Sequence, residues 1–111
     1  MKSINEWCKA AYQNSKDHGF HENEQNENVA EKIALIHSEI SEALEEVRNG
    51  NPLNHIYFNE KGKPEGFVVE LADAVIRIFD LCGMYDLDLN RAIELKHEYN
   101  KGRPFKHGKK F

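Results

Sequence analysis

Four charged side chains share one narrow stripe of an otherwise apolar segment, residues 67–82 (FVVELADAVIRIFDLC). They are Glu70, Asp73, Arg77 and Asp80. At about 100° per residue in a helix, these positions fall within roughly 80° of arc. Burying a carboxylate is costly unless something compensates its charge, so this stripe indicates a metal or catalytic site. Arg77 has an alternative, purely structural role, in which it neutralises Asp73 or Asp80 one turn away.

The preceding helical segment carries a second set of carboxylates. Between residues 29 and 47 the apolar side chains repeat at helical spacing, at Val29, Ile33, Ile36, Ile40, Ala43, Leu44 and Val47. Glu39 and Glu42 lie beside this stripe and share one helix face as i, i+3 neighbours, as Glu70 and Asp73 do. Two helices packed along their apolar stripes would bring the pairs face to face. Four hard oxygen donors suit Mg²⁺, with Mn²⁺ as the alternative.

Length and composition are those of one soluble domain covering residues 1–111. The chain has 40% hydrophobic and 31% charged residues, and no apolar run approaches the roughly 18 residues of a membrane span. The amino terminus has no apolar signal region, which makes a cytoplasmic location the expectation and a membrane partner unexpected. Cys8 and Cys82 both lie in apolar helical patterns, so we expect them to be reduced core residues.

The net charge of −4 hides an asymmetry. Residues 96–111 carry six Lys or Arg against one Glu, a net of +5, which leaves −9 for residues 1–95. The acidic part would repel a nucleic acid polymer. A small phosphorylated ligand, bridged to the carboxylates by a metal, fits the asymmetry better. The plainer alternative is a solvated basic tail.

Four helical patterns and almost no strand signal predict an all-α antiparallel bundle, with its site between the second and third helices. Ser3-x-x-Glu6 is a capping box that starts a helix at about 4–14. The second helix is expected to start after Asn26 or Asn28 and to end near 48, and the third to span about 65–83. The fourth starts after Asp86 or Asp88 and ends near 102. Residues 51–65 are expected to form a long loop with a short extended piece at 55–58.

The two carboxylate pairs also carry a family resemblance. Glu39-Ile-Ser-Glu42, followed by Glu70-Leu-Ala-Asp73, resembles the metal-binding signature of the all-α nucleoside triphosphate pyrophosphohydrolases, the MazG-like superfamily. The family pattern begins Glu-Glu-x-x-Glu, and here Ser38 stands in its first position. The Lys96-x-x-x-Asn100-x-x-Arg103-Pro104 segment resembles the carboxy-terminal element of that family, so the resemblance covers about residues 16–105.

This resemblance implies hydrolysis of ribo- or deoxyribonucleoside triphosphates to the monophosphate and pyrophosphate, by water attack at the α-phosphorus. It implies that Glu39, Glu42, Glu70 and Asp73 hold the metal, which screens the triphosphate and acidifies the water. Glu46 is the first candidate to orient or deprotonate that water. Relatives pack bundle to bundle, which implies a homodimer or homotetramer. The phosphate contacts, within one chain or across a subunit boundary, would come from Lys96, Asn100, Lys101 and Arg103.

The nucleobase needs a partly apolar slot with aromatic faces. Trp7, His18 and Phe20 are the candidates, although Trp7 also keeps helical spacing with neighbouring apolar residues and is better explained as core. His18-x-x-His21 has no cysteine or second histidine pair nearby, which argues against a zinc site.

The rival interpretation is a non-catalytic helical bundle that binds a basic partner or a nucleotide without turning it over. The missing acidic residue at Ser38 leaves room for a catalytically weak member.

Overall fold

Helices form most of the chain in the computed structural model, which describes residues 1–110 apart from the side chains of Gln25 and His107. In chain order the elements are α1 (Ile4–Asp17), a short 3₁₀ turn η1 (Glu24–Asn26), α2 (Val29–Arg48), strands β1 (Tyr57–Phe58) and β2 (Pro64–Glu65), α3 (Phe67–Met84), α4 (Leu89–Lys101) and a second 3₁₀ turn η2 (Phe105–Gly108). The predicted all-α class is therefore confirmed.

The helices begin where side chains satisfy their free backbone amides. The Ser3 hydroxyl accepts from the Glu6 amide at 3.1 Å, and the Glu6 carboxylate accepts from the Ser3 amide at 3.0 Å, which confirms the capping box. The Asn28 side chain accepts from the Ala30 amide at 2.8 Å and starts α2. Asp88 plays the same part for α4, accepting from the amide of Arg91 at 3.1 Å.

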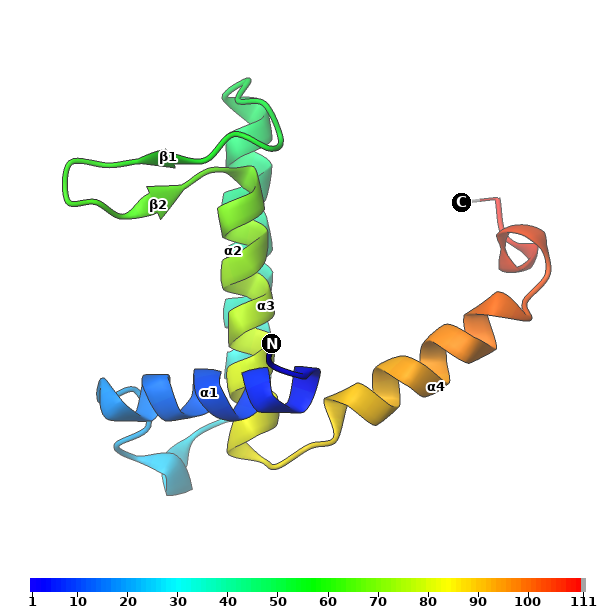
Figure 1. Ribbon diagram of the computed structural model, residues 1–111, viewed down its shortest axis with the longest axis horizontal. Helices are drawn as coiled ribbons and strands as arrows, with labels where there is room; N and C mark the ends of the chain where they lie inside the picture. The colour runs from blue at the N-terminus through cyan, green and yellow to red at the C-terminus, as the bar shows by residue number, and fades with distance from the viewer. Residues whose placement is uncertain (111) are drawn as a thin grey trace.

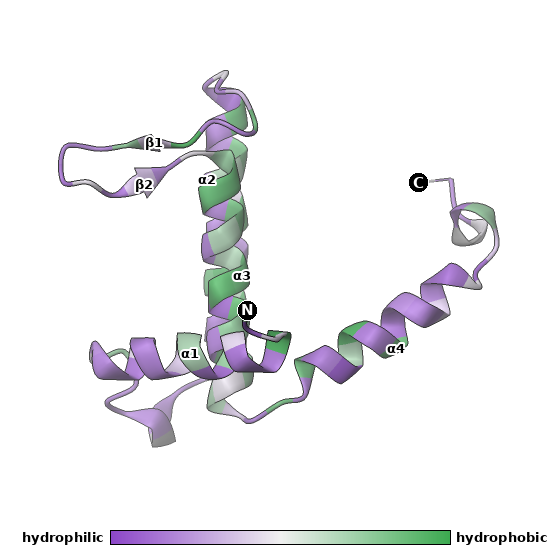
Figure 2. Ribbon diagram, in the orientation of Figure 1, coloured by the Kyte–Doolittle hydropathy of each residue, from purple (hydrophilic) through white to green (hydrophobic). Residues whose placement is uncertain are grey.

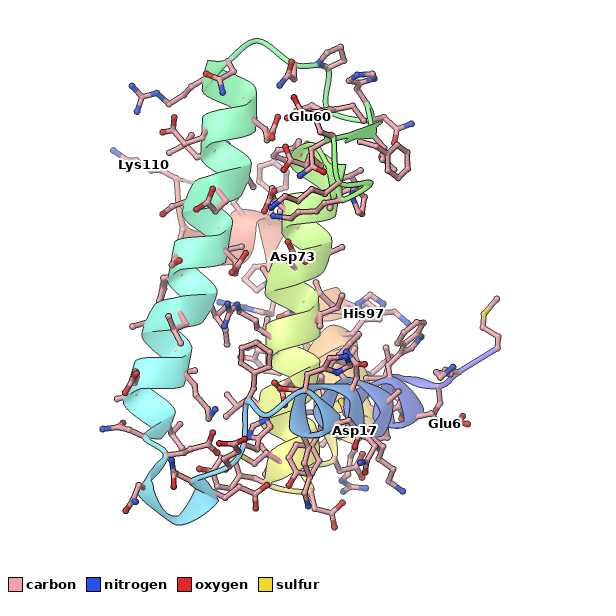
Figure 3. The ribbon with its side chains drawn as sticks, turned by 90° about the vertical axis from the view of Figure 1, so that its left-hand side faces the viewer. Glu6, Asp17, Glu60, Asp73, His97 and Lys110 are labelled. Carbon is pink, nitrogen blue, oxygen red and sulfur yellow. The ribbon has the colours of Figure 1, made fainter. Side chains whose placement is uncertain are left out.

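Helices α2 and α3 lie side by side and antiparallel (Figures 1 and 3). Each carries a small buried residue, Ala43 on α2 and Ala74 on α3, both 2% exposed. The contact between the two helices is narrower than the sequence predicted, because most of the predicted apolar stripe of α2 stays exposed, with Ile33 at 43%, Ile40 at 49% and Leu44 at 55%. This pairing brings the carboxylates of the two helices together.

Helix α1 crosses the carboxy-terminal half of α3 at a very close approach (Figure 1). A Cβ built on Gly83 would lie 2.2 Å from the Cys8 carbonyl oxygen, so only glycine fits there. Cys8 and Cys82 are both buried at this crossing as free thiols, which confirms the sequence expectation. The Trp7 ring stacks on Phe79 with centroids 6.4 Å apart, and Trp7 thereby packs onto α3.

The segment after α2 is a small antiparallel hairpin rather than an unstructured loop. Tyr57 pairs with Glu65 and Phe58 with Pro64. The hairpin is fixed at its base by Gly66, which has a φ of 130° and no room for a side chain, since a Cβ would lie 2.3 Å from the His55 carbonyl oxygen. The hairpin projects sideways from the amino-terminal end of α3 (Figure 1).

Helix α4 leaves the other three helices after its first turn (Figure 1). Its start is tied to α1 by Asn5, whose amide donates to Asp88 at 2.8 Å and whose carbonyl accepts from the Asn90 amide at 3.1 Å. Apolar side chains remain exposed along it, including Ile93, Leu95 and Tyr99. Figure 2 shows hydrophobic positions between the hydrophilic ones along α4. The expected packing of all four helices into one bundle is therefore not reached within a single chain.

The chain exposes more surface than a lone domain of its size. Its accessible area is 8739 Å², whereas a folded monomer of 12.9 kDa typically exposes about 6,300 Å². The radius of gyration is 16.6 Å, against about 13 Å for a compact domain of this length. Within residues 1–110 no large side chain is completely buried. In the same range, no helix is both long enough and apolar enough to cross a membrane.

Candidate metal centre and adjoining cleft

Three carboxylates from α2 and α3 converge in the groove between the two helices. One oxygen each of Glu39, Glu70 and Asp73 lies within 4.8 Å of the others, and all three residues are partly buried. Asp73 lies between the two helices in Figure 3. The predicted meeting of the two acidic pairs is thus found for these three residues. Hard oxygen donors at this separation are the ligand set of a divalent cation such as Mg²⁺ or Mn²⁺.

The charges in this cluster oppose one another. Burial raises the pKa of Glu70, and the charges of Asp73, Glu42 and Glu39 raise it further. Burial also raises the pKa of Asp73, with Glu39 adding to the effect, while Lys63 and Arg77 oppose it. The cluster therefore holds more negative charge than its neighbours compensate, which favours an added cation.

Arg77 reaches across to α2 rather than along its own helix. Its Nε donates to Glu39 Oε1 at 2.8 Å, forming an ion pair in which Arg77 remains about half exposed, at 46%, and Glu39 is 16% exposed. The sequence interpretation that Arg77 pairs with Asp73 or Asp80 is therefore wrong about the partner. Its charge nevertheless opposes the rise in the pKa of Asp73 and so partly neutralises that carboxylate as well.

Glu42 lies at the margin of the cluster. Its charge contributes to the raised pKa of Glu70, so the two carboxylates are near each other. It is exposed, however, and its oxygens are not among the three that lie within 4.8 Å. Glu42 thus stays a candidate fourth ligand, reached from the solvent side of the groove.

Glu46 is fixed by the hairpin segment. Tyr57 donates its hydroxyl to Glu46 Oε1 at 2.8 Å, and the Asn51 amide donates to Oε2 at 2.7 Å. The hydrogen bond to Glu46 is the largest cause that raises the pKa of Tyr57 to about 12, followed by burial and by the charges of Glu46, Glu65 and Glu70. Glu46 is therefore held in a fixed orientation by Tyr57, whose pKa also responds to the charge of Glu70. Sequence reasoning missed Tyr57 and Asn51 because residues 51–65 showed no decodable pattern.

A cleft of about 670 Å³ adjoins the metal centre. The end of α1, residues 18–28, the first turns of α2 and the second half of α3 form its walls. Its lining includes Phe20, His18, Lys32 and Arg77, and Arg77 connects it to Glu39 of the metal centre. Phe20 and His18 are thus in a place that suits the predicted nucleobase slot. Trp7 is not part of this lining and packs on Phe79 instead.

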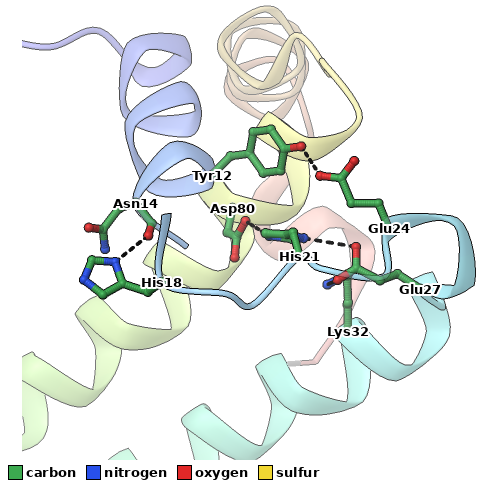
Figure 4. A network of polar contacts seen from close by, with 8 residues as sticks. All are labelled: Tyr12, Asn14, His18, His21, Glu24, Glu27, Lys32 and Asp80. Atoms are coloured by element: carbon green, nitrogen blue, oxygen red, sulfur yellow. Dashed lines mark hydrogen bonds and ion pairs between the residues drawn. The ribbon is translucent and has the colours of Figure 1, made fainter. Parts of the chain in front are cut away.

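A buried polar network lies along one side of the cleft (Figure 4). The His21 ring faces Glu27 through Nδ1 at 3.0 Å and Asp80 through Nε2 at 2.8 Å. Glu27 also accepts from Lys32 Nζ at 3.2 Å. The stripe on α3 thus serves two sites, with Glu70 and Asp73 at the metal centre and Asp80 here. Sequence reasoning considered His21 only as half of a zinc motif that it rejected, and it offered Arg77 as the partner of Asp80, so it missed this contact.

The basic and amide residues predicted to hold phosphate lie on α4 and just after it, away from the metal centre of the same chain (Figure 1). Lys96 Nζ and the Arg103 guanidinium carbon lie 5.0 and 5.5 Å from the centroid of the Tyr99 ring. Lys101 forms an exposed ion pair with Glu98 at 3.2 Å. Within one chain, therefore, Lys96, Asn100, Lys101 and Arg103 do not join the carboxylates.

Comparisons with protein families, with curated proteins and with solved structures find no match to this chain.

Proposed function

We propose that this protein is a metal-dependent nucleoside triphosphate pyrophosphohydrolase with a MazG-like fold. It would cleave ribo- or deoxyribonucleoside triphosphates to the monophosphate and pyrophosphate by water attack at the α-phosphorus. The observation that supports this most is the three-carboxylate cluster of Glu39, Glu70 and Asp73, whose oxygens lie within 4.8 Å of one another, beside a cleft of about 670 Å³. Such a cleft falls in the size range of small-molecule sites.

The carboxylate cluster fits Mg²⁺ or Mn²⁺, because its donors are hard oxygens and its negative charge is incompletely compensated. Glu39, Glu70 and Asp73 would hold the ion, with Glu42 as the fourth protein ligand. A divalent ion bound there supplies charge screening for the triphosphate and acidifies water. Glu46, oriented by Tyr57 and Asn51, would accept a hydrogen bond from the attacking water and hold it in line with the α-phosphorus.

The adjoining cleft would receive the nucleoside. Phe20 offers an exposed aromatic face and His18 lies close by in the same lining. Arg77 stands where the cleft meets the metal centre, which is where the phosphate chain would leave the nucleoside. Arg77 would then lie beside the α-phosphate, where its charge would stabilise the negative charge of the reacting group.

A second copy of the chain would complete the site. The accessible area exceeds that of a typical monomer by about 2,400 Å², which is more than the roughly 800 Å² that each partner buries in a standard interface. Exposed apolar side chains lie along both α2 and α4. A homodimer or homotetramer would cover them and could bring one chain's Lys96, Asn100, Lys101 and Arg103 to the acidic groove of another, where opposite charges favour docking.

Pyrophosphate release from a panel of nucleoside triphosphates tests the proposal directly. We expect release with Mg²⁺ or Mn²⁺, none with EDTA, and nucleoside monophosphate as the other product. Glu70→Gln and Asp73→Asn should each abolish turnover, whereas Glu45→Gln, an exposed carboxylate on α2 outside the cluster, should retain it. Release of orthophosphate would show attack at a different phosphorus. Absence of any release, with a tolerated Glu70→Gln, would favour the non-catalytic binding module.

A further inference from the structure

His21 is buried between carboxylates from two different parts of the chain. Its side chain is 1% exposed, while those of Glu27 and Asp80 are 14% and 22% exposed. Glu27 comes just before α2, and Asp80 lies on α3 (Figure 4). An ionised carboxylate only accepts hydrogen bonds, so both ring nitrogens must donate. Only the doubly protonated, cationic imidazole can do so.

This ring connects the wall of the cleft to the helix that carries the metal ligands. His21 follows Phe20 directly in the chain, and both residues line the cleft. Glu27, held by one ring nitrogen, also accepts from Lys32 of α2, which lines the cleft too. The imidazolium therefore ties residues 18–28, α2 and α3 to one another at a single point.

We propose that cationic His21 is a positioning residue, which holds the segment 18–28 against α3 and so keeps the cleft wall that carries Phe20 in its binding geometry. Loss of one ring proton would place a nitrogen lone pair against a carboxylate and release the segment. While the ring stays cationic, at neutral and mildly acidic pH, the cleft would bind its ligand. As the pH rises and the ring loses its proton, the cleft would lose that ability. Naming a nucleotide as that ligand rests on the proposed function.

The groups around the ring support a contact that is present at lower pH and lost at higher pH. Burial alone would lower the pKa of His21, but the hydrogen bonds to Glu27 and Asp80, together with their charges, raise it overall. The other groups that face the network are Tyr12 of α1, whose ring lies 4.9 Å from that of His21 and whose hydroxyl bonds Glu24, and Lys32 of α2. A raised pKa in the folded state means that the contact is fully formed below the ordinary His value of 6.5 and is lost on going upward through the raised value.

The first test is an NMR titration of the metal-free full-length protein between about pH 5.5 and 9. We expect the ring nitrogens of His21 to titrate above the ordinary His value of 6.5, and the backbone amides of residues 18–28 to change together with His21. A His21 ring that is neutral at pH 6, or an unchanged segment while the ring loses its proton, would overturn the proposal.

A matched substitution separates the cationic contact from mere packing. In Asp80→Asn the introduced amide can donate to a neutral ring nitrogen, while the other ring N–H still donates to Glu27. The segment 18–28 should then stay ordered to higher pH than in the wild type. If the segment in Asp80→Asn instead loosens over the same pH range as in the wild type, protonation of the ring does not hold the segment and the proposal fails.

Nucleotide binding provides the functional readout, with nucleoside monophosphates as non-hydrolysable probes. We expect the wild-type Kd to increase by about tenfold between pH 6 and 9. This is the change expected if one molecule in ten still holds the segment 18–28 against α3 at the higher pH. We expect Asp80→Asn to remove most of that pH dependence. In turnover assays the same dependence should appear in KM more than in kcat. A pH-independent Kd would refute the positioning role. If no nucleotide binds at any pH while the segment titrates with His21, the positioning role stands and the proposed function fails.

Discussion

Removing one carboxylate from the metal centre should stabilise the metal-free protein. The oxygens of Glu39, Glu70 and Asp73 lie within 4.8 Å of one another. At that separation two unit charges repel by about 3.5 kcal/mol at an effective dielectric of about 20, and by about 1 kcal/mol in bulk water. Because these groups are only partly buried, we expect Glu70→Gln to raise the free energy of unfolding in EDTA by about 1–3 kcal/mol. For a domain of this size that corresponds to a Tm increase of roughly 4–13 °C.

A divalent ion should reverse this order. Wild-type protein gains about 2.7 kcal/mol when the ion is present at a hundred times its Kd, whereas Glu70→Gln lacks a ligand and should gain much less. The assay is thermal unfolding followed by circular dichroism at 222 nm, in EDTA and in a Mn²⁺ or Mg²⁺ series. The protein concentration must be held constant because oligomer stability depends on it.

The control is Glu45→Gln, which removes a carboxylate from the exposed side of α2. It should change the Tm little in either condition and should leave the metal-induced shift intact. The reasoning about the cluster is refuted if Glu70→Gln is less stable than wild type in EDTA. It is also refuted if the metal stabilises both proteins by the same amount.

Three further substitutions test neighbouring parts of the structure. Arg77→Gln frees Glu39 from its ion pair and should tighten Mn²⁺ binding by up to about fivefold in calorimetry; unchanged or weaker binding would contradict competition for Glu39. Tyr57→Phe removes the hydroxyl that orients Glu46 and should cost about 1 kcal/mol in urea unfolding, with kcat reduced more than KM. Gly83→Ala would normally favour a helix, but its Cβ meets Cys8, so we expect a loss of about 1–3 kcal/mol; a gain in stability would show that α1 can move aside.

The helices and their starts could be predicted from sequence because the signals are local. Ser3, Asn28 and Asp88 cap helices within three residues of their own positions. The meeting of Glu39 with Glu70 and Asp73 was expected from the pairing of adjacent antiparallel helices. The apolar stripe of α2 did not by itself decide which face touches α3, because most of it remains exposed. Glu42 shows the limit of such reasoning, since a shared helix face does not decide which oxygens come within bonding distance.

The rest depends on contacts between distant parts of the chain. His21 lies 59 positions from Asp80, and no spacing rule links a histidine in a connecting segment to one acidic side chain on a helix. The departure of α4 is likewise set by what it packs against, and helical periodicity reports only that one face is apolar. Of the hairpin, only β1 lies in the extended piece expected at 55–58. The second strand escaped prediction because two residues are too few for an alternating pattern.

The two glycines of the hairpin place very different constraints on change. Gly66 at the base leaves no room for a Cβ, whereas a side chain at Gly62 near the tip would meet nothing within 4 Å, although its φ of 79° still favours glycine. Residues can therefore be inserted or a label attached at the tip, around Asn59 to Gly62, while Tyr57 still reaches Glu46. In a lineage under selection, the tip of this hairpin is where the chain can lengthen and acquire new contacts without altering the carboxylates beneath it.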